Sequence, residues 1–351
     1  MHFCKVPLKF LTIIFWLISL PTFSQTLGGN SIFNFLKLPN APSLSAMGGI
    51  NTSYDGNDIG LAFNQPALLK PAMHSQLNAS FNAFYASTKA YHLSLGYHHP
   101  QTKTTFMYGV FFLKYGNAVE TDASGNVYGE FNANDWVMQV SASRQYLDKW
   151  RYGSTIKFIS SNYGQYKSNG IAIDVGLLFS DTAKLFTAGL LVKNMGTQLK
   201  KYNGAGGEDL PFDLQLGMTK KLPNAPFAFS MTLHHLHQFD IRYDDTVYNA
   251  LNDFQQNGKG NFFFDKIFRH VVIASHIYLG KNVEATLGYN HLRRKELNIG
   301  REGNGLNGFS AGVGIKAGKF NFQYAQTRYQ NNSGDNQIVL MLHLNRLVNL
   351  N

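Results

Sequence analysis

Strand-length alternation of apolar and polar side chains recurs along this chain after residue 75. From Phe227 to His234, phenylalanine, methionine and leucine alternate with alanine, serine, threonine and histidine, and similar runs begin at Ile171, Val283 and Phe309. Successive side chains of a β-strand point to opposite faces, so each run has one apolar face. Runs of about 10 residues match the length of a transmembrane β-strand. The pattern therefore predicts an all-β, antiparallel transmembrane barrel.

We expect about 14 strands, an even number of the kind that bacterial outer-membrane barrels use. Their expected starts are Gln76, Lys89, Thr104, Gly129, Trp150, Lys167, Lys184, Pro211, Pro226, Arg269, Asn282, Asn307, Lys319 and Gln337.

The expected connections alternate in length. With both termini in the periplasm, short turns fall at His99–Lys103, Asp148–Lys149, Asp181–Ala183, Leu222–Ala225, Gly280–Lys281 and Ala317–Gly318. Outward loops, most of them long, fall at Ala118–Tyr128, Ser161–Tyr166, Lys193–Leu210, Gln238–Phe268, Arg294–Leu306 and Gln330–Asn336. The one exception is the first hairpin, near Ser87, which is expected to be tight on the outer side. A soluble β-sandwich, the alternative class, would not show this parity.

The first 24 residues have the pattern of a secretory signal. Lys5 and Lys9 precede an apolar run from Phe10 to Leu20, which is too short to span a bilayer. The chain's single cysteine, Cys4, lies in this segment, so the exported chain would have no disulfide and no thiolate chemistry. We expect a signal peptide at 1–24, a periplasmic or plug segment at 25–74, the barrel at 75–346 and a tail at 347–351.

Composition agrees with a barrel in the outer membrane. Aromatic residues make up 14% of the chain and there are 33 glycines, which suits interfacial aromatic girdles and a crowded lumen. The mean hydropathy of −0.18 reflects strands in which only alternate residues face lipid. The net charge of +10 suits a surface beside lipopolysaccharide phosphates, although solubility alone accounts for it equally. We expect no nucleic-acid partner.

The best metal candidate in the sequence is the group His234, His235 and His237 with Asp240. A zinc site needs ligands that converge on one point. Strand alternation would send His235 and His237 to the lipid side and His234 to the other side. We therefore expect imidazoles at the membrane–water boundary and no metal site.

No catalytic signature stands out. The chain has many serine and histidine residues but no G-x-S-x-G element to pair them. Gly312-Val313-Gly314 resembles the start of a nucleotide loop, but no strand–helix unit surrounds it. We expect a non-enzymatic protein with no catalytic residues and no cofactor.

Two charged groups are singled out. Lys157, Asp174, Glu284 and Lys316 fall on the polar faces of their strands, where buried charges need partners or water. We expect them to form a salt-bridge network that plugs the lumen, with an aqueous path as the alternative. The second group is basic and outward, and could contact lipopolysaccharide phosphate or simply be solvated: Lys200, Lys201, Arg293, Arg294, Lys295 and Arg301.

The segment before the barrel carries the motifs GGNSIFNFLKLP (28–39), SAMGG (45–49) and LAFNQPALL (61–69). These motifs resemble those of the PorQ family of the type IX secretion system of Bacteroidetes and, more loosely, those of the PorV and fatty-acid-transporter-like barrels. Gln65 interrupts the Asn-Pro-Ala motif of that group. The chain also ends without the usual final aromatic residue of outer-membrane barrels.

The resemblance implies a non-enzymatic member of the attachment complex, which works with PorU, PorV and PorZ to anchor cargo to lipopolysaccharide. It also implies a plug or interaction segment that packs into the barrel mouth, formed by Phe33, Phe35, Leu36, Leu38, Pro39, Asn64 and Pro66. The main alternative is a fatty-acid-transporter-like channel for hydrophobic solutes, and a lipid hydrolase is a third hypothesis.

Overall fold

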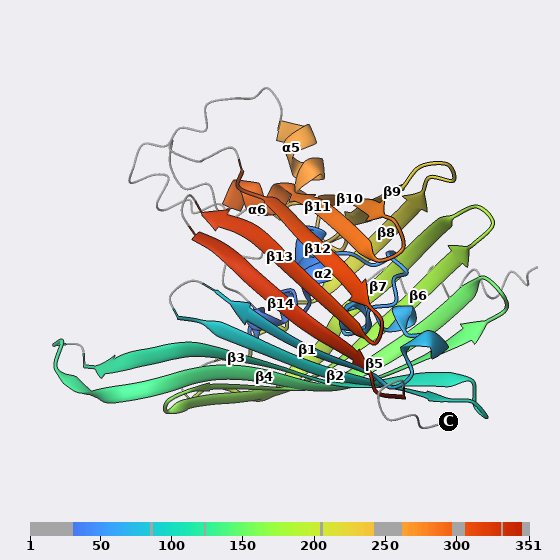
Figure 1. Ribbon diagram of the computed structural model, residues 1–351. Helices are drawn as coiled ribbons and strands as arrows, with labels where there is room; N and C mark the ends of the chain where they lie inside the picture. The colour runs from blue at the N-terminus through green and yellow to red at the C-terminus, as the bar shows by residue number, and fades with distance from the viewer. Residues whose placement is uncertain are drawn as a thin grey trace, which may run out of the picture.

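The computed structural model describes residues 31–84, 87–122, 124–203, 206–241, 262–296, 306–330 and 333–345. These residues form a closed antiparallel barrel of 14 strands (Figure 1), which confirms the predicted fold class. The strands are β1 (Gln76–Ala83), β2 (Lys89–His99), β3 (Thr104–Thr121), β4 (Val127–Tyr146), β5 (Trp150–Tyr163), β6 (Tyr166–Asp181), β7 (Phe186–Lys200), β8 (Asp213–Lys221), β9 (Phe227–Leu233), β10 (Val271–Leu279), β11 (Val283–Asn290), β12 (Phe309–Ala317), β13 (Phe320–Gln330) and β14 (Ser333–His343).

The barrel closes because β1 pairs with both β2 and the last strand, β14. Gln76 at the start of β1 lies opposite His343 at the end of β14. Each described strand therefore pairs with a neighbour on both sides, as a sheet that spans a bilayer requires. Among the described residues, no helix is both long and apolar enough to cross a bilayer.

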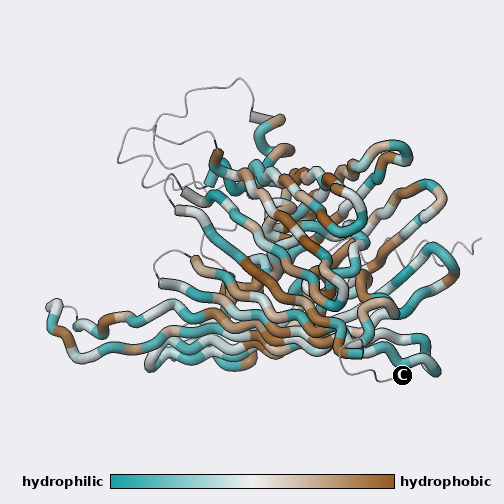
Figure 2. The backbone as a smooth tube through the Cα atoms, in the orientation of Figure 1, coloured by the Kyte–Doolittle hydropathy of each residue, from teal (hydrophilic) through white to brown (hydrophobic). Residues whose placement is uncertain are grey.

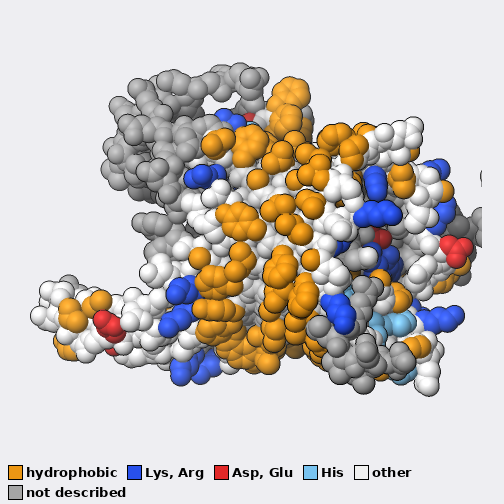
Figure 3. Space-filling model, in the orientation of Figure 1, with side chains coloured by type: hydrophobic (Ala, Val, Ile, Leu, Met, Phe, Trp, Pro, Cys, Tyr) orange, Lys and Arg blue, Asp and Glu red, His pale blue; other side chains and the backbone are white. Residues whose placement is uncertain are grey.

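The outer wall of the barrel is apolar along the middle of the strands. Ile156, Leu93 and Phe229 are 59%, 52% and 52% exposed, while their neighbours Thr155, His92 and Ser230 are buried. Apolar residues gather along the central part of the strands (Figure 2), and Lys and Arg side chains lie on either side of the hydrophobic zone (Figure 3). This surface is suited to the hydrocarbon core of an outer membrane. Cleavage of residues 1–24 stays a prediction, because that segment lies outside the described residues.

The strands differ strongly in length. β3 and β4 have 18 and 20 residues, whereas β8 and β9 have 9 and 7. The β3–β4 hairpin projects beyond the rest of the barrel (Figure 1). The prediction of a loop over Ala118–Tyr128 was therefore wrong at both ends, because the ladder continues to a pair between Thr121 and Val127. The connection predicted at Ser161–Tyr166 is present but shorter, a two-residue turn at 164–165, since Tyr163 pairs directly with Tyr166.

Residues 31–74 lie inside the barrel and fill much of its lumen. They form short helical turns: η1 (Asn34–Lys37), α2 (Pro42–Ala46), α3 (Ile59–Ala62), η2 (Pro66–Leu68) and η3 (Pro71–Met73). Their apolar side chains share one buried cluster with inward residues of the wall such as Phe111 and Ile159. The ring of Phe35 stacks at 6.3 Å on that of Phe111. We call residues 31–74 the plug.

Two short helices lie at the end of the barrel that carries the longer connections, which we call the loop end. They are α5 (Phe262–Arg269) and α6 (His291–Glu296). The opposite end, with the short hairpins, is called the turn end. The expected outward loop from Arg294 thus begins within a helix, and α6 joins α5 through Asp265, which pairs with His291 at 3.2 Å. A helix considered for residues 246–256 and the expected tail at 347–351 lie outside the described residues.

Candidate functional site

Glycines of the inner wall set how closely the plug approaches. A Cβ atom at Gly189 would lie 2.0 Å from the carbonyl oxygen of Thr52, and one at Gly288 would lie 2.4 Å from that of Ala46. A Cβ at Gly153 would lie 2.6 Å from the backbone of Pro66. Backbone contact of this kind leaves no space for any other residue. The glycine content noted in the sequence therefore serves, at these positions, to seat the plug.

Polar groups fix the centre of the plug to the short strands. The Ser45 hydroxyl donates to Gln337 Oε1 at 2.5 Å, and the Ser310 hydroxyl donates to the carbonyl of Ala46 at 3.1 Å. Asn290 Nδ2 donates to the carbonyl of Gly48 at 3.0 Å. These groups are buried, so each lost bond would leave an unsatisfied polar atom. The wall thus holds α2 in one position.

An ion-pair group ties the plug to the wall at the turn end. Asp55 of the plug pairs with Arg151 of β5 at 3.2 Å and with Lys70 at 3.0 Å. Arg151 also donates to the carbonyl oxygens of Ala67 and Leu68 at 3.3 and 3.2 Å. Burial opposes the charged carboxylate, but the two cations outweigh it and hold the pKa of Asp55 below its usual value. We call Asp55, Lys70 and Arg151 the latch.

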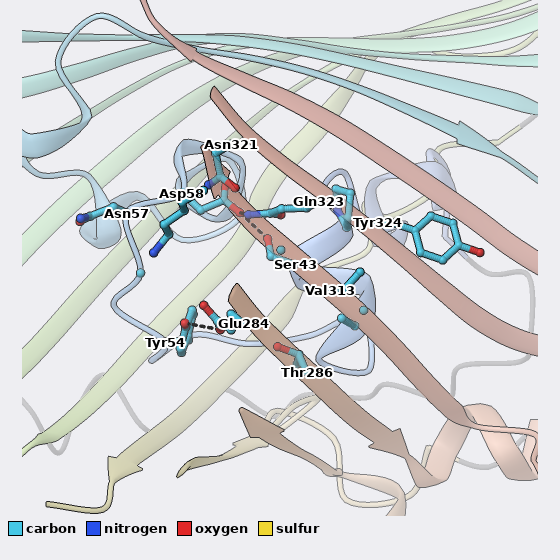
Figure 4. Close-up of a pocket in the computed structure, with 16 residues that line it drawn as sticks. Ser43, Tyr54, Asn57, Asp58, Glu284, Thr286, Val313, Asn321, Gln323 and Tyr324 are labelled. Carbon is cyan, nitrogen blue, oxygen red and sulfur yellow. Dashed lines mark hydrogen bonds between the residues drawn. The ribbon is translucent and has the colours of Figure 1, made fainter. Parts of the chain in front are cut away.

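A small cavity of about 60 Å³ lies on the turn-end side of α2 (Figure 4). Asp58 faces it and accepts hydrogen bonds from Ser43 Oγ at 2.5 Å and from Gln323 Nε2 at 3.3 Å. Burial raises the pKa of Asp58, against the effect of these donors. On the other side of the cavity, the Tyr54 hydroxyl donates to Glu284 Oε1 at 2.5 Å. We call this the turn-end cavity.

A larger cavity of about 270 Å³ lies on the loop-end side of the plug, bounded partly by α6. Apolar residues of the plug and of α6 make up much of its lining: Leu36, Leu38, Leu44, Ile50 and Leu292. Three cationic residues also line it, namely Lys37, Lys193 and Arg293. We call this the loop-end cavity. Helix α2 contributes to both cavities, Leu44 to this one and Ser43 to the other, so α2 separates them.

The lumen charges predicted from the sequence divide between different partners. Lys157 and Asp174 form an ion pair at 2.6 Å and are almost fully buried. Asp174 lies opposite a bulge in β7, where it accepts from the backbone N–H of Asn194 at 2.7 Å. Glu284 instead binds the plug through Tyr54, and Lys316 is exposed at the turn end. The Lys157–Asp174 pair thus braces the wall and Glu284 contacts the plug, but the four residues do not form the salt-bridge network expected to plug the lumen.

Ser230, His276 and Glu284 are arranged like a catalytic triad. Ser230 Oγ lies 3.1 Å from His276 Nε2, and His276 Nδ1 lies 3.2 Å from Glu284 Oε1. However, Ser230 is only 4% exposed, and its hydroxyl also contacts Thr219 Oγ1 at 2.9 Å, which in turn contacts Ser53 of the plug at 2.8 Å. The three groups are enclosed in a polar contact between wall and plug. We therefore interpret them as structural.

The histidine group is arranged differently from its prediction. Strand β9 ends at Leu233, and His235 has a left-handed backbone with φ of 54°, so alternation does not continue through the group. His234 and His235 consequently face each other, with their Nδ1 atoms 2.6 Å apart. Asp213, at the start of the paired strand β8, lies beside them, and one ligand atom from each of the three lies within 4.8 Å of the others. The sequence analysis named His237 and Asp240 for this group, and the structure instead brings the sequence-distant Asp213 to His234 and His235.

The structure places the expected plug residues and basic residues as follows. Phe33, Phe35, Leu36, Pro39, Asn64 and Pro66 are buried, and Leu38 is partly buried. Lys200, Lys201, Arg294 and Lys295 are exposed. Arg293 differs from the expected outward group, because it lines the loop-end cavity and its guanidinium lies against Gly49. Arg301 lies outside the described residues.

Comparison with known proteins gives structural neighbours only. No family model matches the sequence, and no curated protein matches it. The toluene transporter TodX of Pseudomonas putida is 11% identical, with a TM-score of 0.50 over 91% of this chain and 98% of that chain. The CymD monoaromatic hydrocarbon channel is 13% identical, with a TM-score of 0.49 over 89% and 97%. At this identity the TodX similarity shows a shared barrel fold.

Proposed function

We propose that this protein is a non-enzymatic outer-membrane channel for hydrophobic solutes, in which the plug closes the path through the lumen. The observation that carries the proposal is the pair of cavities on opposite sides of α2. The loop-end cavity combines apolar side chains over part of its lining with many polar and charged groups, and apolar surface of this kind is common in small-molecule sites. A solute held there would reach the turn end only if α2 and the adjoining plug backbone moved.

The structural neighbours support this proposal at the level of architecture. TodX, described as a toluene transporter, has the same overall fold over nearly the whole of both chains. In the present chain, Leu36, Leu38 and Leu44 supply apolar contacts for a ligand of that kind, and Lys193 and Arg293 add cationic groups at the cavity wall.

The test is binding of the hydrophobic fluorescent probe N-phenyl-1-naphthylamine to the purified, detergent-solubilised barrel. We expect saturable binding that toluene and medium-chain fatty acids displace. Leu38→Trp should fill part of the cavity and weaken binding about tenfold, equivalent to about 1.4 kcal/mol. Leu93→Trp, on the exposed outer wall, is the matched control and should leave the cavity affinity unchanged. Probe binding that is non-saturable, or equal in both variants, would contradict the channel.

A second candidate function rests on the amino-acid sequence of the plug. The motifs at 28–39, 45–49 and 61–69 resemble the PorQ family, and the described part of them forms the plug. In that case the barrel would be a type IX secretion component that works with PorU-, PorV- and PorZ-like proteins. Exposed Lys200, Lys201, Arg294 and Lys295, with Arg301, would then be candidate contacts for lipopolysaccharide.

Affinity purification from solubilised outer membranes separates the two candidates. Recovery of a large surface peptidase together with other secretion components supports the attachment role. Recovery of the barrel alone, carrying a bound hydrophobic molecule, supports the channel.

A further inference from the structure

Three potential metal ligands converge at the loop end of the lumen, on two paired strands. Asp213 is the first residue of β8, and His234 and His235 directly follow β9. One ligand atom from each residue lies within 4.8 Å of the other two. The left-handed backbone of His235 makes this possible, because regular alternation would send the two imidazoles to opposite faces. The group is separate from the latch and from the Tyr54–Glu284 contact.

His234 has a nitrogen that the surrounding protein does not satisfy. Its side chain is fully buried, and its Nδ1 atom lies 2.6 Å from Nδ1 of His235. Two neutral imidazoles can satisfy this contact with one proton, donated by either ring. Nε2 of His234 has no hydrogen-bond partner among the described residues, and it has a free lone pair able to bind a metal when Nδ1 of His234 carries the shared proton. Leaving such a buried atom unsatisfied is unfavourable, so the arrangement indicates a missing binding partner.

The carboxylate is held in place by neighbouring donors. Asp213 Oδ1 accepts from the backbone N–H of His235 at 2.6 Å, and Oδ2 accepts from Gln215 Nε2 at 2.7 Å. The backbone N–H of His234 donates to the carbonyl of His270 at 3.0 Å, which fixes the chain beside the imidazole. Hydrogen bonds that orient the ligands are the usual support of a metal site.

We propose that Asp213, His234 and His235 bind a divalent transition-metal ion, with Zn²⁺ the best match. Two imidazoles and one carboxylate are a common zinc donor set, and three protein ligands leave one tetrahedral position open. The same three residues line the loop-end cavity, so an ion that they bind would adjoin that cavity. Lys193 and Arg293 line that cavity as well, and their charges favour an anion or hydroxide as the fourth ligand.

Zinc binding is measured on full-length protein purified through a tag without histidine and stripped with EDTA. Isothermal titration with Zn²⁺ should show one saturable site, and Co²⁺ should give the intense visible bands of a tetrahedral complex. Asp213→Asn and His235→Ala should abolish the Co²⁺ bands and saturable Zn²⁺ binding. Gln215→Leu should weaken Zn²⁺ binding about 10–100-fold, because it removes only the support of the carboxylate.

His98→Ala is the matched control, since His98 lies at the turn end, away from the cluster, and its loss should leave the titration unchanged. Folding of each variant is checked by its heat-modifiable mobility on gels. A folded wild-type barrel without saturable Zn²⁺ binding would overturn the proposal. Equal binding by wild type and folded Asp213→Asn would overturn it too, because the ion would then lie elsewhere.

Discussion

At the scale of single residues, the ion pair between Lys157 and Asp174 places two opposite charges in the protein interior, where each charge depends on the other for compensation. Both side chains are almost fully buried, with 2.6 Å between charged atoms. Lys157→Met would leave the Asp174 carboxylate buried without a counter-charge, and we expect it to lower the free energy of unfolding by about 3–5 kcal/mol. Urea titration of the barrel in lipid vesicles measures the change. Adding Asp174→Asn should restore part of the loss, and an unchanged single variant would show that water reaches the pair.

The latch predicts how the plug responds to acid. Because the folded protein lowers the pKa of Asp55 below 3.8, its carboxylate stabilises the folded state above pH 3.8. That contribution is lost as the pH falls through the lower folded pKa. Hydrogen–deuterium exchange, corrected for intrinsic rates, should therefore show plug amides near Asp55 losing protection below pH 3.8. Arg151→Met should lower this protection already at neutral pH and flatten its acid dependence; an unaltered profile would argue that the latch is not what retains the plug.

At the scale of the strands, the two faces of a ladder predict opposite responses to the same substitution. Val313 of β12 is 39% exposed on the outer wall, whereas Ser230 of β9 is buried in the lumen. Val313→Arg should make refolding into vesicles less favourable by about 2–4 kcal/mol if residue 313 lies near the bilayer midplane. Ser230→Arg should avoid that lipid cost and instead displace the Thr219 and His276 contacts. If the free energy of refolding changes equally in both variants, our assignment of the faces is wrong.

The strands were more predictable than what joins and fills them. Gln76, Lys89, Thr104 and Trp150 begin strands as expected, because alternation is imposed by lipid on one side and a packed lumen on the other. That signal disappears where β3 and β4 extend beyond the apolar zone, and their outer ends were assigned to a loop. The packing of the plug and the contact of Asp213 with His235 depend on tertiary structure. The two-residue alternation of apolar and polar side chains carries no information about such contacts.

At the scale of the whole molecule, the proposed channel function requires that the plug move relative to the wall. The Ser53 and Thr219 hydroxyl oxygens lie 2.8 Å apart across that boundary, which is close enough for a pair of cysteines to bridge at about 2.05 Å between sulfurs. The double variant Ser53→Cys, Thr219→Cys should fold as wild type, since the exported chain is expected to contain no other cysteine. When oxidised, it should tether the plug to β8 at a position two residues from the latch residue Asp55.

We expect this lock to abolish uptake of N-phenyl-1-naphthylamine by intact cells, while binding of the probe to the loop-end cavity persists. Reduction should restore uptake, and each single cysteine variant should behave as wild type under oxidising conditions. Separation of uptake from binding would identify the plug as the gate, because the cavity is untouched and only the path beyond α2 is closed. If the oxidised barrel still admits the probe, solutes bypass the plug. If wild type admits none, the barrel is a closed scaffold, and the attachment role becomes the stronger candidate.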